Sequence, residues 1–151
     1  LQNGETISNA TNGTVEISGV TKAGIVQPAS IYNSDGSETL DATMSGKTVV
    51  CTKSDGTTTI TIPNPEAATV GVVYEIVQTA DRQVDVVCTT ANSNGIVADN
   101  VATSDKVSLA TASHLIGGGI RVIGIQTAAS TYKWFATAMS PTEPLTVEAA
   151  D

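Results

Sequence analysis

The feature that most constrains the fold is a series of short runs in which β-branched residues alternate with polar ones. Residues 57–62 alternate strictly, which places Ile60 and Ile62 on one face, and Pro63 ends the run because proline cannot donate to a β-ladder. No window of about 11 residues or more carries the apolar stripe of a helix. The other strand candidates follow at a spacing of about ten residues, the rhythm of a sandwich or barrel, and they span residues 48–53, 70–79, 83–90, 96–98, 106–111, 120–126, 132–139 and 145–148.

Length and composition set the size and make-up of the core. The chain has 151 residues, enough for one domain; 40% are hydrophobic but only 3% are aromatic, so the core must be built mainly from Val, Ile and Ala. Such β-branched residues pack well on a pleated surface. The sequence therefore predicts an all-β protein, an antiparallel β-sandwich or jelly-roll-like barrel with extended N- and C-terminal arms. Residues 1–46 are expected to form an arm or loosely packed strands, residues 47–140 the core, and residues 141–151 a tail.

The charge pattern and the lengths of the apolar stretches argue against two classes of partner. The formal net charge is −8, and the seven Lys and Arg residues are scattered singly, whereas nucleic-acid binding needs them clustered. No stretch approaches the roughly 20 apolar residues of a membrane span. We therefore expect neither a nucleic-acid partner nor a membrane partner.

Two cysteines, Cys51 and Cys88, each end a Val-rich run. A disulfide between them is one interpretation. The favoured alternative is two free thiols that behave as small hydrophobes, because two cysteines in a chain of this length do not make a disulfide scaffold.

No catalytic or metal-binding pattern stands out. The single histidine, His114, directly follows Ser113, which would not face it from another element as a catalytic triad requires. The acidic turns match a calcium loop poorly, and a glycosidase pair would lack aromatic platforms. Gly117 to Gly119 lacks the Lys and Ser or Thr of a phosphate loop, so we expect it to lead into a central strand, or to mark a place where another backbone comes close. The sequence thus predicts no catalytic residue, cofactor or metal, and no enzyme.

Two segments, Ile116 to Gly124 and Tyr132 to Ala136, carry a resemblance. With the runs around residues 59–63, 74–77, 84–86 and 94–98, they resemble small β-sandwich virion proteins of tailed bacteriophages, the capsid decoration (cement) proteins and the related head-fibre-type proteins. The likeness covers roughly residues 47–140 and is a pattern of strands and turns.

The resemblance implies a structural role on the virion. A decoration protein would sit on the outer capsid surface as a homotrimer, bind the major capsid protein and stabilise the shell. The alternative is a phage fibre tip or a carbohydrate-binding module, which would use exposed aromatic residues, here Tyr32, Tyr132 and Trp134.

Runs that are apolar on both faces supply interface candidates. Residues 120–125 and 72–77 could fill the core with one face and meet a neighbouring subunit with the other, or they could be central strands buried on both faces. The candidate interface with another subunit or the capsid comprises Ile120, Val122, Ile123, Ile125, Tyr132, Val15 and Ile17.

Overall fold

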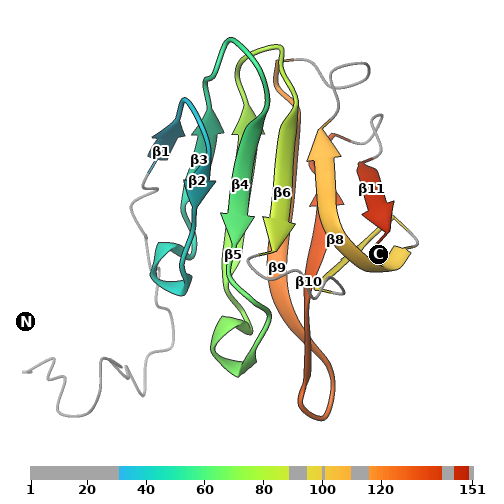
Figure 1. The fold of residues 1–151 in the computed structure, drawn as a ribbon. Coiled ribbons are helices and arrows are strands. Elements are labelled where there is room, and N and C mark those ends of the chain that lie inside the picture. Colours follow the sequence, from blue (N-terminus) through green and yellow to red (C-terminus); the bar gives the residue numbers. More distant parts are fainter. Residues whose placement is uncertain (1–30, 89–94, 100, 110–115, 141–144, 150–151) are drawn as a thin grey trace, which may run out of the picture.

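The computed structural model describes residues 31–88, 95–99, 101–109, 116–140 and 145–149 (Figure 1). Two short 3-10 helices, η1 (Ala42–Met44) and η2 (Ala67–Thr69), accompany the strands. The described strands, in chain order, are β1 (Ile31–Ser34), β2 (Glu38–Thr39), β3 (Thr48–Cys51), β4 (Thr58–Ile62), β5 (Val73–Gln78), β6 (Val84–Cys88), β7 (Ile96–Ala98), β8 (Val101–Leu109), β9 (Gly119–Ala128), β10 (Thr131–Ala138) and β11 (Thr146–Ala149).

The all-β class is confirmed, and the strands lie close to the predicted runs. They form one sheet in the order β1-β3-β5-β9-β10-β7-β8-β6-β4-β2, and β11 pairs with β8. The sheet extends past residues 47–140 at both ends, because β1 and β2 precede that range and β11 follows it. No helical segment in the described part of the chain has the length and apolar character that a membrane-crossing helix needs.

The expected antiparallel pairing is corrected, because the sheet is mixed. The first six strands alternate between two halves of the sheet: β1, β3 and β5 pair in parallel in one half, and β2, β4 and β6 do so in the other. Parallel neighbours need a crossover, and here each crossover runs through a strand of the opposite half. Antiparallel pairs join β9 to β5, β10 to β9, β8 to β6 and β7 to β8.

The two halves belong to one curled sheet, a half-barrel, and not to two separate sheets. Figure 1 shows one half in front of the other, with the long hairpin of β9 and β10 in the rear half. The halves are joined on one side by a parallel pair between β10 and β7, in which Trp134 lies opposite Ile96. The sheet order ends at β1 and β2, which are its edges.

Trp134 and Tyr74 are the two largest fully buried side chains of the core. Their ring centroids lie 5.6 Å apart. Trp134 Nε1 donates to the carbonyl oxygen of Pro63 at 2.8 Å, and the Tyr74 hydroxyl donates to the carbonyl oxygen of Asp41 at 2.7 Å. Both aromatic residues therefore bury their rings while their polar atoms keep hydrogen-bond partners.

Two glycines mark places where backbones come close. A Cβ at Gly119 would lie 3.0 Å from the carbonyl oxygen of Ile76, so the expected close approach in the glycine run is confirmed there. A Cβ at Gly124 would collide with the carbonyl oxygen of Thr69 in η2. Because Gly124 has no side chain, η2 can lie directly against β9.

Replacing Trp134 with Ala should lower the free energy of unfolding by about 3–5 kcal/mol, as other truncations of large buried aromatic residues do. Urea unfolding followed by circular dichroism measures the change. Val70→Ala is the control, because Val70 is 46% exposed and its truncation should cost no more than about 0.5 kcal/mol. Equal costs for the two variants would contradict the buried position of Trp134.

Gly124→Ala should destabilise the protein by about 1–3 kcal/mol, because the added methyl group must push η2 away from β9. Gly36→Ala provides a matched control, since a Cβ at Gly36 meets no atom within 4 Å. Thermal unfolding of the two variants tests the close contact, which a harmless Gly124→Ala change would disprove.

Candidate functional site

The described residues contain no cluster of three or more His, Cys, Asp or Glu residues that could hold a metal ion. Cys51 is buried in β3 and Cys88 is half-buried in β6, and both are free thiols, as the favoured interpretation of the sequence predicted. His114 lies outside the described residues.

Two thiols and one phenol in the described part of the chain have pKa values that burial raises. Burial raises the pKa of the Cys51 thiol to about 11. Burial, assisted by the carboxylate of Asp105, raises the pKa of the Cys88 thiol to about 12. A nucleophilic cysteine needs a lowered pKa. Burial, followed by the charge of Asp41, also raises the pKa of Tyr74 to about 12, so this phenol stays protonated.

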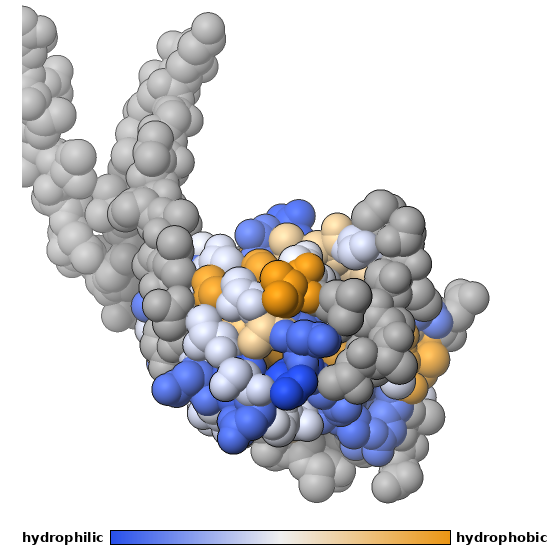
Figure 2. All heavy atoms as spheres, turned by 90° about the horizontal axis from the view of Figure 1, so that it is seen from above, coloured by the Kyte–Doolittle hydropathy of each residue, from blue (hydrophilic) through white to orange (hydrophobic). Residues whose placement is uncertain are grey.

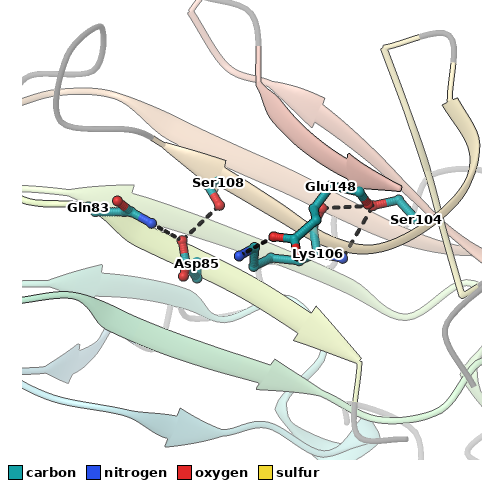
Figure 3. A network of polar contacts seen from close by, with 6 residues as sticks. All are labelled: Gln83, Asp85, Ser104, Lys106, Ser108 and Glu148. Carbon is teal, nitrogen blue, oxygen red and sulfur yellow. Dashed lines mark hydrogen bonds and ion pairs between the residues drawn. The ribbon is translucent and has the colours of Figure 1, made fainter. Parts of the chain in front are cut away.

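The outer face of the half formed by β4, β6 and β8 carries a network of polar side chains (Figure 3). One oxygen of Asp85, Oδ1, accepts hydrogen bonds from Gln83 Nε2 at 2.8 Å and from the Ser108 hydroxyl at 2.7 Å. This carboxylate therefore connects β6 to β8 through neutral donors.

A second group on the same face fastens β11 to β8. Lys106 Nζ forms an ion pair with Glu148, which raises the pKa of Lys106. The Ser104 hydroxyl lies 2.7 Å from the carbonyl oxygen of Lys106 and 2.6 Å from that of Glu148, and it accepts a hydrogen bond from the amide of Lys106. The side chain of Glu148 is 57% exposed, so the ion pair contributes about 1 kcal/mol or less. These contacts hold β11 against β8.

The opposite outer face, on β5, β9, β10 and β7, carries a row of apolar side chains. Ile123 pairs with Val73 on one side and with Phe135 on the other, and Phe135 pairs in turn with Val97. Each has a buried residue beside it along its strand, so all four point away from the core. Phe135 is 41% exposed. We call these four residues, Val73, Ile123, Phe135 and Val97, the apolar row.

Further apolar groups lie toward the end of the molecule where β9 begins and β10 ends. Met139 is 47% exposed and Ile116 is 68% exposed, and the Met139 side chain packs over Gly119. Figure 2 shows the molecule from above, with apolar residues gathered near the centre of that view and hydrophilic ones beside them. Between the apolar row and this end lie Glu75 and Arg121, with Oε1 and Nε 3.9 Å apart.

The structure separates the predicted interface candidates. Ile120 and Val122 are fully buried in the core, so they are not available to a partner. Ile123 and Ile125 lie half-buried on the outer face. Tyr132 is half-buried on β10, opposite Gln126. The remaining two candidates, Val15 and Ile17, lie outside the described residues.

Phe135 and Val97, which help to complete the apolar row, were not among the interface candidates predicted from the sequence, whereas Val73 lies in the run 72–77 that is apolar on both faces. The available signal was the alternation in residues 131–138, which places Phe135 on the face opposite Trp134.

No protein-family model and no curated protein sequence matches this chain.

Both thiols should resist modification in the folded protein. At pH 8, 5,5′-dithiobis(2-nitrobenzoic acid) should titrate two thiols rapidly in guanidinium chloride and react much more slowly with the native protein. In the unfolded chain the thiols ionise near their ordinary pKa of 9.0, whereas burial raises the folded-state pKa values to about 11 and 12. The free energy of unfolding therefore keeps its full value below about pH 9 and falls as the pH rises from 9 toward 11–12. The melting temperature should therefore fall above pH 9. Rapid native reaction at pH 8 would contradict the burial of Cys51 and Cys88.

Proposed function

We propose that the protein is a structural virion protein, a capsid decoration (cement) protein that binds the outer capsid surface as a homotrimer and stabilises the shell. The observation that carries the proposal is the partly exposed apolar row centred on Phe135, on one face of an acidic protein. The resemblance of residues 47–140 to phage decoration proteins supplies the class of assembly. The partners would be the major capsid protein and further copies of this chain.

The energetics suit a protein that works by packing. Burying apolar surface against a partner contributes about 25 cal/mol per Å². A row that is four strands wide, with an aromatic residue near its centre, has the make-up of an interface core, where charged residues are depleted and aromatic residues enriched. The opposite face, with Asp85, Lys106 and Glu148, has the make-up of a surface that stays in water.

One observation favours the decoration role over the alternative of a carbohydrate-binding module. Such a site stacks sugars on exposed aromatic rings, and Trp134, one of the three candidates, is fully buried. Tyr132 is half-buried, and the side chain of Tyr32 lies outside the described residues. Within the described residues, Phe135 is the most exposed aromatic side chain, and it lies in a row of aliphatic residues.

Adding the protein to purified empty shells of the virus that encodes it should raise the temperature at which the shells rupture. Light scattering during heating measures the rupture, and pelleting the shells measures bound protein. An unrelated acidic protein of similar mass and charge is the control. Shells that neither bind the protein nor gain stability from it would contradict the proposed function.

A further inference from the structure

The outer face that carries the apolar row differs in charge from the rest of the chain. The described residues that point outward from β3, β5, β9, β10 and β7 include one acidic residue, Glu75, and two basic ones, Arg121 and Lys133. The whole chain has 15 acidic and 7 basic residues. Two copies of an acidic protein repel each other at most orientations, and this face is where that repulsion is weakest.

We propose that copies of this chain pack against one another through this face, around an axis parallel to β9, with the β5 side of one copy against the β10 side of the next. The number of copies, three, rests on the proposed function. The choice of surface and of orientation rests on the register of the strands.

The strand register places apolar residues at the same height on the β5 side and on the β10 side of the face. Val73 on β5 and Phe135 on β10 both pair with Ile123 on β9, so they lie at the same height along the strands. A rotation about an axis parallel to β9 keeps every residue at its height. Val73 of one copy therefore meets Phe135 of the next, and the apolar rows form one continuous ring.

The charges match in the same arrangement. Glu75 pairs with Arg121 across β5 and β9, so they also share a height. Arg121 Nε and Glu75 Oε1 are 3.9 Å apart, and the Arg121 side chain is 50% exposed and the Glu75 side chain 42% exposed, so each has room for a second partner. An arginine has five donors and a carboxylate accepts several hydrogen bonds. In this arrangement Glu75 of one copy lies opposite Thr137 of the next, and Thr137 pairs with Arg121 on β9. Glu75 can thus accept from Arg121 of its own chain and, past the short Thr137 side chain, from the long Arg121 side chain of the next copy.

The test is a pair of cysteines that can bond only between copies. Val73 and Phe135 flank Ile123 two strand spacings apart, about 10 Å, whereas a disulfide needs Cα atoms within about 7 Å. After mild oxidation, the Val73→Cys, Phe135→Cys double variant should run as a covalent trimer on a non-reducing gel. The wild-type chain, with Cys51 and Cys88, is run beside it.

A matched pair on the polar face is the control. Thr61 and Lys106 flank Val87 in the same way, on β4 and β8. The Thr61→Cys, Lys106→Cys variant should remain monomeric under the same conditions. A monomer or a covalent dimer from the Val73 and Phe135 pair, or equal cross-linking of the two faces, would overturn the proposal.

A charge exchange tests the same surface without new cysteines, at two partly exposed positions that should leave folding intact. Arg121→Glu should weaken self-association at least tenfold in sedimentation equilibrium, and adding Glu75→Arg should restore it. An unchanged association in Arg121→Glu would overturn the proposal.

Shell binding separates this proposal from the proposed function. Covalent trimers that leave shell stability unchanged would refute the decoration role and keep the interface. Shells stabilised by a protein that fails to cross-link would refute the interface and keep the decoration role.

Discussion

The rest of the structure depends on the parallel pair between β10 and β7, which joins the two halves of the curled sheet and is organised around Trp134. The backbone amide of Trp134 donates to the carbonyl oxygen of Gly95 at 2.7 Å, and its indole donates to Pro63 in the opposite half. The ring lies between the halves against Tyr74. Trp134 thus contacts the joining strand pair, the core and the opposite half at once. Only 3% of the residues are aromatic, so most of the remaining core is built from smaller apolar side chains.

The pairing of β10 with β7 also determines which side chains point away from the core. Because Trp134 and Ala136 point inward, their neighbour Phe135 must point outward. The pairing of β5, β9, β10 and β7 then lines up Val73, Ile123 and Val97 with it. The other half turns Asp85, Lys106 and Glu148 outward, where they bond to one another or to nearby hydroxyl and amide groups. The two faces therefore have different chemistry, and this asymmetry supports a protein that packs through one face and meets water with the other.

The alternation of the sequence predicted most of the strands and part of the core, including Ile60 and Ile62, because burial on one face of a strand has a period of two. It did not predict the parallel pairing, since this period is the same in parallel and antiparallel sheets and the crossing between halves depends on tertiary contacts. The placement of the interface candidates could not be predicted in the same way. Residues 120–125 are apolar on both faces, so the sequence could not show that Ile120 and Val122 point inward and Ile123 outward.

The most direct test of the central claim, that the face with Phe135 is covered in the working protein, is hydroxyl-radical footprinting across a range of protein concentrations. Phe135 and Met139 are 41% and 47% exposed in the single chain. Their oxidation, measured by mass spectrometry, should fall as the concentration rises, while that of Val70, 46% exposed and in the turn after η2, stays constant. Oxidation of Phe135 and Met139 that is independent of concentration, and unchanged when shells are added, would contradict the account.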